Sequence, residues 1–452
     1  MSNKKKTHFQ LSSKDNKISF FGLDKINSLF SGEHLSYILK NGGISFIFKI
    51  LGVFLGFLVI YIVTNHYNEK YYGAFALMQV IIQLLVIVFS LGLPNILVIE
   101  ANKNIENKTY AIQLLKSIYF KIFLIGIIPA FILFVGAPYI SEYIFLKPNL
   151  EIGFKIMGVS LIFFLLYETT LNFFVAQKCF FKYGLFMFVM PNMFFILFMV
   201  LFKTYVTSEN YIFFLYSLSF IFSLILAVLS INWKSYQQKI ILPEFNRLLK
   251  DSTPIMLSTV TMFLLNWVAV IILGRYTNEA QVGIYNTAFK IGLSVQLVML
   301  TINIIIAPKV ADLYHNKKNE ALKTFIHQST WLITIITFPL ALFVIIFNHW
   351  LLGFFGEEFV IQGSFALIII TISTLINAVT GNVDQILNMT GNQKSFFRVI
   401  FLALVINVVF NLIFIPKFGI NGAALACLVA TIFMNVAALI VIKRKLGYYT
   451  LF

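Results

Sequence analysis

Long apolar runs constrain the fold of this chain more than any other feature of the sequence. We count twelve of them, each about 20 residues long, which is the length that crosses the about 30 Å hydrocarbon core of a bilayer as a helix. They cover residues 42–63, 74–99, 115–136, 153–174, 183–202, 211–231, 254–274, 283–306, 329–347, 364–386, 397–415 and 420–442. Because 59% of the residues are hydrophobic, far more than a soluble chain buries, the sequence predicts an all-α membrane protein.

The basic residues predict how the chain lies in the membrane. The net charge of +16 would suggest nucleic acid in a soluble protein, but here the lysines and arginines cluster in short segments between apolar runs. If the N-terminus is inside, 25 of the 34 basic residues fall in inward segments. We therefore expect no nucleic-acid partner and a multi-pass membrane protein with both termini in the cytosol.

Features of an enzyme or of a cofactor site are missing from the sequence. Cys179 and Cys427 have neither a disulfide framework nor metal-ligand spacing. GFFGEEF at 353–359 is too short for a nucleotide-binding loop and lacks a Lys or Thr for phosphates. The outward segments have about 17 residues at most, which leaves little room for a catalytic domain. We expect no catalytic residue, no metal and no cofactor.

The chain repeats itself. QKCFFK (177–182) recurs as QKSFFR (393–398), and at an offset of 210 residues several other positions match in order. The matches pair Leu39-Lys40 with Leu249-Lys250, Asn68-Glu69 with Asn278-Glu279, Gly73 with Gly283, and Pro129 with Pro339. A duplicated unit of six helices has an even number of spans, so both copies point the same way, as in parallel-repeat transporters. We interpret the hexapeptides as inner anchors rather than substrate contacts.

The repeat predicts two six-helix lobes. The predicted division is a cytosolic N-terminal segment (1–41), an N-terminal lobe (42–232), a cytosolic linker (233–253), a C-terminal lobe (254–442) and a cytosolic tail (443–452). The linker prediction depends on its length and its Lys and Gln content.

Polar residues inside the spans are the candidate site. Ser45, Lys49, Gly52 and Gly56 share one helical face, and Asn266 matches Gly56 in the repeat. Further stripes contain Gln79 and Gln83 in the second span, and Asn286 and Lys290 in the eighth. We predict that these helices face a central cleft. Snorkelling of the two lysines and structural amide bridges between helices remain the alternatives.

Two carboxylates lie at matching positions of the repeat. Glu168 and Asp384 fall toward the inner ends of the fourth and tenth spans. They are candidates for proton or cation coupling, and the alternative is a structural pair with a nearby lysine or a water-exposed helix end.

Several segments together resemble a known family. YYGAFALMQ (71–79), FSLGLPN (89–95), VGIYNTAFKI (282–291), APKVADLY (307–314) and IPKFGINGAALA (415–426) are similar to the polysaccharide transporters, or O-antigen-type flippases, of the multidrug/oligosaccharidyl-lipid/polysaccharide exporter superfamily. The resemblance covers the chain after about residue 40. It implies two lobes around a cleft that opens alternately to each side.

The resemblance also implies a substrate, an oligosaccharide on undecaprenyl diphosphate that is flipped for O-antigen, capsule or a similar surface polysaccharide. Lys49 and Lys290 would attract the diphosphate, and Arg275 at the outer mouth would receive or release it unless it is an ordinary loop cation. The expected partners are this lipid, membrane lipid, and polymerase and chain-length proteins; we expect a monomer. The alternatives are a cation-coupled multidrug exporter, which usually has an acidic residue where Lys49 stands, and a membrane enzyme or assembly protein of envelope synthesis.

Overall fold

The computed structural model describes residues 33–104, 108–205, 208–233 and 242–450, and in these ranges it is helical with no strand. Residues 1–32 of the predicted N-terminal segment and 234–241 of the predicted linker lie outside the described residues. Helix α10 begins at Phe245, so the second part of the predicted linker is helical.

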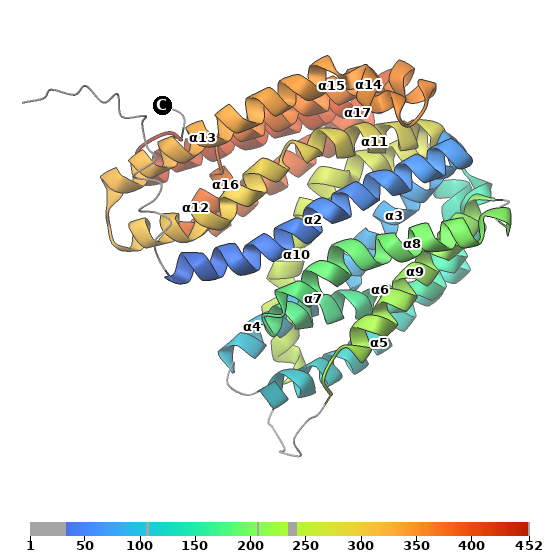
Figure 1. The fold of residues 1–452 in the computed structure, drawn as a ribbon, viewed down its shortest axis with the longest axis horizontal. Coiled ribbons are helices and arrows are strands. Elements are labelled where there is room, and N and C mark those ends of the chain that lie inside the picture. Colours follow the sequence, from blue (N-terminus) through green and yellow to red (C-terminus); the bar gives the residue numbers. More distant parts are fainter. Residues whose placement is uncertain (1–32, 105–107, 206–207, 234–241, 451–452) are drawn as a thin grey trace, which may run out of the picture.

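Helices of the first half form one group in Figure 1, at the bottom of the view, with α2 and α3 nearer the middle. They are α2 (Glu33–His66), α3 (Glu69–Phe89), α4 (Leu93–Lys103), α5 (Lys108–Tyr139), η1 (Ile140–Ile144), η2 (Pro148–Leu150), α6 (Glu151–Ala176), α7 (Phe180–Gly184), η3 (Leu185–Val189), α8 (Met190–Leu201), η4 (Lys203–Tyr205) and α9 (Glu209–Leu229). The two π-helical turns η1 and η3 continue α5 and precede α8.

Helices of the second half lie above them, and α10 and α11 stand between the groups (Figure 1). They are α10 (Phe245–Tyr276), α11 (Glu279–Ser294), α12 (Leu297–His315), α13 (Asn319–Ile346), α14 (Asn348–Gly353), α15 (Glu357–Val379), α16 (Val383–Met389) and α17 (Gln393–Leu446). Many large apolar side chains on the outer helices are exposed, as lipid-facing side chains are.

Ten segments of the described chain are long and apolar enough to cross a membrane. Two differences explain why the structure has ten such segments where the sequence predicts twelve spans. The eighth predicted span is divided between α11 and α12, which are separated at Val295 and Gln296. The last two predicted spans are both in α17, which bends at Gly419, where φ is 56°. The fold is the predicted all-α membrane fold.

The repeat has a physical basis at the starts of α3 and α11. Asn68 accepts a hydrogen bond from the Tyr71 amide at 3.0 Å, and Asn278 accepts one from the Gln281 amide at 2.9 Å, so both asparagines are N-caps. One turn later Gly73 of α3 meets Gly283 of α11 backbone to backbone. A Cβ on Gly73 would lie 1.6 Å from the Glu279 carbonyl oxygen. The two halves therefore touch at equivalent glycines.

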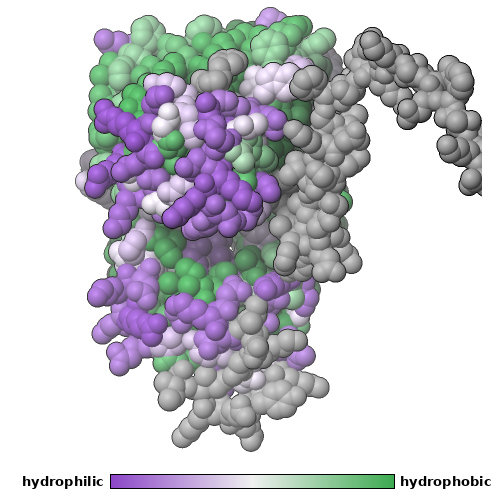
Figure 2. Space-filling view, turned by 90° about the vertical axis from the view of Figure 1, so that its left-hand side faces the viewer, coloured by the Kyte–Doolittle hydropathy of each residue, from purple (hydrophilic) through white to green (hydrophobic). Residues whose placement is uncertain are grey.

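One end of the molecule, where α4 ends and α7 and α13 begin, carries most of the described basic side chains, and we call it the basic end. Figure 2 shows this face hollowed between two groups of hydrophilic side chains, one from each half. The hexapeptides lie here, at the starts of α7 and α17. Lys182 of the first one donates to the Ser230 carbonyl at the end of α9 at 2.5 Å, as an anchor would.

Candidate functional site

Two lysines predicted for the cleft line one cavity, which we call the lysine cavity. Lys49 of α2, Gln79 of α3 and Lys290 of α11 contribute polar groups to it, and its volume is about 410 Å³. Gly52 and Gly56 line it beside Lys49, so the predicted face of the first span turns toward this space. The cavity draws on both halves of the chain.

Lys290 is held by neutral groups. Its Nζ lies 3.3 Å from the Tyr72 hydroxyl and 5.8 Å from the centre of the Tyr72 ring. That hydroxyl donates to Oδ1 of Asn286 at 2.7 Å. Within the described residues, no carboxylate lies within 4.0 Å of the Lys49 or Lys290 amine. The lysines therefore bring positive charge into the cavity without a resident counter-ion.

The other predicted amides occupy different places. Gln79 donates to the Tyr216 hydroxyl at 3.4 Å, at the edge of the lysine cavity. Asn286 is buried and does not line the lysine cavity. Gln83 is exposed and does not line it either. Asn286 thus positions Lys290 through Tyr72 instead of facing the cleft.

An apolar groove adjoins the lysine cavity. Phe57 and Ser294 line both spaces, and the groove extends between α2, α13 and α14 along Phe54, Phe343 and Leu351. Its volume is about 510 Å³. A ligand with a charged part and an apolar part could therefore place the charged part in the lysine cavity and the apolar part in the adjoining groove.

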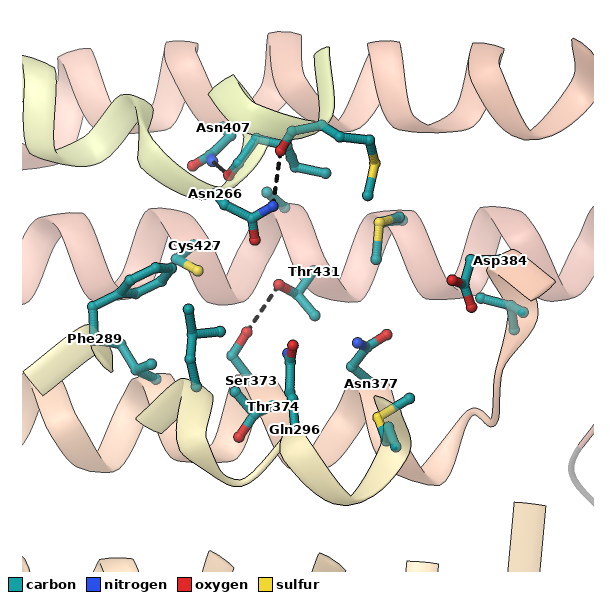
Figure 3. A pocket seen from close by; sticks show the side chains of 18 of the residues that line it. Asn266, Phe289, Gln296, Ser373, Thr374, Asn377, Asp384, Asn407, Cys427 and Thr431 are labelled. Atoms are coloured by element: carbon teal, nitrogen blue, oxygen red, sulfur yellow. Dashed lines mark hydrogen bonds between the residues drawn. The ribbon is translucent and has the colours of Figure 1, made fainter. Parts of the chain in front are cut away.

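A second polar space, the amide cavity, lies within the second half and measures about 240 Å³. Its polar lining comes from Asn266 of α10, Gln296 and Asn303 at α12, Ser373, Thr374 and Asn377 of α15, Asp384 of α16, and Asn407 and Thr431 of α17. Figure 3 shows labelled members of this set pointing into a common space. Leu293 and Gln296 line this cavity and the lysine cavity, so the two adjoin at the junction of α11 and α12.

The two matching carboxylates differ in their surroundings. Asp384 lines the amide cavity and accepts from the Gln385 side chain at 3.2 Å. Glu168 accepts from Asn172, one turn along the same helix, at 3.0 Å. No lysine, arginine or histidine of the described chain lies within 4.0 Å of either carboxylate. The alternative of a structural pair with a lysine therefore finds no partner here.

Arg275 lies away from the three cavities. Its guanidinium donates to the carbonyls of Tyr143 and Ile144 at 2.6 and 2.8 Å, at the end of η1. The nearby Lys147 donates to the carbonyls of Gly274 and Thr277 at 2.5 and 2.7 Å, at the end of α10. Burial lowers the pKa of Lys147, and Glu279 opposes that shift. These two cations join the halves at the end opposite the basic end.

The sequence stripes missed Tyr72, Asn377 and Gln296. A signal for Tyr72 existed, because it stands seven residues before Gln79 and so on the same helical face. Asn377 is a lone amide within an apolar run, and its position relative to the cavity depends on long-range packing. No group of three or more His, Cys, Asp or Glu in the described residues is arranged to hold a metal ion.

Comparisons with known proteins agree with this architecture. A family model described as polysaccharide biosynthesis protein matches residues 38–314, and the MatE model matches residues 254–413. The chain is 27% identical over 173 residues to the probable low-salt glycan biosynthesis flippase Agl15 of Haloferax volcanii. This match covers 37% of the chain and 36% of the relative. The probable flippase AglR of the same organism is 23% identical over 167 residues, covering 36% and 35%. The chain thus spans about a third of the length of these curated relatives.

Solved structures share the fold. The inward-facing conformation of a multidrug resistance MATE family transporter has a TM-score of 0.73 at 12% identity, covering 87% of this chain and 94% of that one. The lipid II flippase MurJ, in an inward closed conformation, has a TM-score of 0.68 at 17% identity, covering 90% and 87%. All of these are transporters or flippases by name, and the likeness shows the fold.

Proposed function

This chain belongs to the polysaccharide biosynthesis protein family, whose model matches residues 38–314, and from this membership we propose that it is a flippase for lipid-linked oligosaccharides. The substrate class is a short oligosaccharide on a polyprenyl diphosphate, and undecaprenyl diphosphate is the carrier that we expect. The curated relatives with matching segments are named as flippases, one of them for glycan biosynthesis, which supports the proposal.

One observation carries this proposal: the lysine cavity holds two amines without a carboxylate partner in the described chain. An ionised group at membrane depth costs about 2.5 kcal/mol or more on insertion scales. A diphosphate would offset that cost, since each charge-assisted hydrogen bond contributes about 1.5 to 3 kcal/mol. Lys49 of α2 and Lys290 of α11 would receive it from opposite halves.

The apolar groove would hold the prenyl chain. It adjoins the lysine cavity through Phe57 and Ser294 and is lined almost entirely by apolar groups. A polyprenyl tail in this groove keeps contact with the bilayer while its headgroup enters the cavity, so the tail never crosses a polar space. This arrangement suits a lipid substrate better than a fully water-soluble one.

We propose that transport uses alternating access between two lobes, residues 42–232 and 254–442. The hollow at the basic end (Figure 2) and the backbone contact of Gly73 with Gly283 toward the other end favour an inward-open state. The headgroup would enter from the basic end and leave after the opposite end opens.

The orientation and cellular role follow as further parts of the proposal. With the basic end in the cytosol, both termini are cytosolic and the substrate moves to the outer leaflet of the inner membrane. The product would supply O-antigen, capsule or a similar polysaccharide, with polymerase and chain-length proteins as downstream partners. We propose a monomer, because the cavities are complete within one chain.

The rival function is cation-coupled multidrug export, which the MatE match over residues 254–413 favours. A site for cationic drugs needs negative charge, but the lysine cavity has two lysines and no carboxylate in its lining. Its charge therefore suits an anionic substrate.

Complementation of a host strain that lacks this gene tests the proposal with the native substrate. We expect Lys49→Ala and Lys290→Ala to lower surface glycan about tenfold or more and to trap lipid-linked oligosaccharide on the cytoplasmic leaflet, while protein levels in the membrane stay normal. Lys70→Ala, which changes an exposed lysine on α3, is the matched control and should complement fully. Normal surface glycan with both cavity variants would overturn the diphosphate site.

A further inference from the structure

We propose that the amide cavity binds one sugar ring of the substrate and selects among sugars, an inference that rests on the proposed flippase function. The site was not evident as a unit in the sequence, where only Asn266 and Asp384 among its residues stood out. It lies within the second half, enclosed by α10, α12, α15 and α17.

Its position matches the chemical order of a lipid-linked sugar. The apolar groove meets the lysine cavity at Phe57 and Ser294, and the lysine cavity meets the amide cavity at Leu293 and Gln296. Phe289 lines the amide cavity and its chain neighbour Lys290 lines the lysine cavity, so the two polar spaces lie on either side of α11. Tail, diphosphate and sugar would therefore lie in adjoining spaces of matching polarity.

Three amides in this cavity are free to bind. The side chains of Gln296, Asn303 and Asn377 make no hydrogen bond to another described residue, and Oδ1 of Asn303 is fully buried. A buried polar atom without a partner is costly unless a ligand or water satisfies it. Each amide offers donors and an acceptor, which is what the hydroxyls of a sugar require.

Other polar groups of the cavity are held in place by the protein. Asn407 donates to the Leu265 carbonyl at 2.8 Å and accepts from Asn411 at 2.7 Å. Ser373 donates to Thr431 at 2.9 Å, as drawn in Figure 3. Fixed walls with a few free amides form a preorganised site, in which little side-chain entropy is lost on binding.

The size of the cavity favours a sugar over a bare cation. A volume of 240 Å³ equals that of about eight waters at roughly 30 Å³ each, which is enough for one hexose ring and far exceeds one dehydrated ion. Asp384 is the single carboxylate among the lining residues, and the walls include the rings of Phe289 and Phe396. Rings of this kind pack against the apolar faces of sugars.

Binding to the purified full-length protein in micelles tests this site separately from the diphosphate site. The probes are undecaprenyl diphosphate alone and the same lipid carrying a hexose, an N-acetylhexosamine or a deoxyhexose. We expect at least one sugar-bearing lipid to bind about tenfold more tightly than the bare lipid. Asn377→Ala should remove that gain and leave bare-lipid binding unchanged, whereas Lys290→Ala should weaken both.

Gln362→Ala is the control, since Gln362 is on the same helix α15 but pairs with Glu358 outside the cavity. If no sugar improves binding, or if Asn377→Ala leaves the gain intact, the sugar site is overturned while the lysine site stands. If Lys290→Ala has no effect on any lipid, the proposed diphosphate site fails instead. Replacing sodium by choline tests whether the cavity binds a cation instead of a sugar. If sodium changes lipid binding, and Asn377→Ala abolishes that sodium effect but keeps the sugar preference, the cavity is a cation site.

Discussion

The two halves of this chain match in sequence at several ordered positions, yet their interiors differ. The first half is filled by rings from α3, α6, α8 and α9, namely Phe75, Phe164, Tyr167, Phe195, Tyr216 and Phe220, with centroids 4.4 to 5.8 Å apart. The second half instead encloses the amide cavity. We call the six rings the aromatic cluster.

This difference indicates that the two halves have different mechanical properties. Aromatic pairs at these distances contribute about 0.5 to 1.5 kcal/mol each beyond the area they bury, so the first half has a rigid, solid core. Free amides around a cavity do the opposite, since they leave polar groups unsatisfied until a ligand arrives. The first half therefore suits the role of a rigid wall, and the second that of the selective one.

The largest effect is expected where the halves meet. Gly73→Ala would place a Cβ 1.6 Å from the Glu279 carbonyl oxygen, and only separation of α3 from α11 relieves that overlap. We expect the free energy of unfolding to fall by more than about 4 kcal/mol, so that little folded protein remains after detergent extraction and gel filtration.

Gly56→Ala is the control for this prediction, because a Cβ there meets nothing within 4 Å. It should give normal yields of folded protein. A Gly73→Ala protein that extracts and melts like the wild type would show that the halves do not depend on this contact.

A pair of phenylalanines compares the two interiors directly. Phe164 belongs to the aromatic cluster and is 6% exposed, whereas Phe396 lines the amide cavity and is 7% exposed. Phe164→Ala should lower the free energy of unfolding by about 3 to 5 kcal/mol, the range for phenylalanine truncation in a packed core. Phe396→Ala should cost less, about half as much, because one side of its ring already faces empty space. Thermal melts of both purified variants measure the difference, and equal losses would contradict the contrast between a filled and a hollow half.

Much of the fold could be predicted from the sequence because its causes are local. Apolar runs of bilayer length give the spans, and the paired Asn68 and Asn278 mark helix starts, since an N-cap needs only the next few residues. The start of α10 at Phe245 was missed. The segment before Pro254 is polar, and apolar runs do not reveal a helix that continues beyond the membrane.

The candidate site could be predicted only in part. Lys49 and Lys290 do line one cavity, because a helical stripe fixes which face a residue occupies. The stripe does not determine which distant group forms a hydrogen bond with that residue. Asn286 accepts a hydrogen bond from Tyr72, 214 positions earlier, and Arg275 donates to the carbonyl of Tyr143, 132 positions earlier. Such partners depend on tertiary packing, which no local pattern records.

The smallest expected effect separates the two matching carboxylates. Glu168→Gln should leave transport unchanged, because Glu168 contacts Asn172 on its own helix and lines none of the three cavities. Asp384→Asn should lower transport about threefold, since it removes one strong acceptor from the amide cavity but keeps its shape. Flipping in proteoliposomes, measured with and without a sodium or proton gradient, tests both. If the gradient accelerates the wild type and Glu168→Gln abolishes that acceleration, ion coupling depends on Glu168 in the first half, and the assignment of a purely structural role to Glu168 is wrong. If only Asp384→Asn abolishes it, coupling and sugar selection share the hollow half.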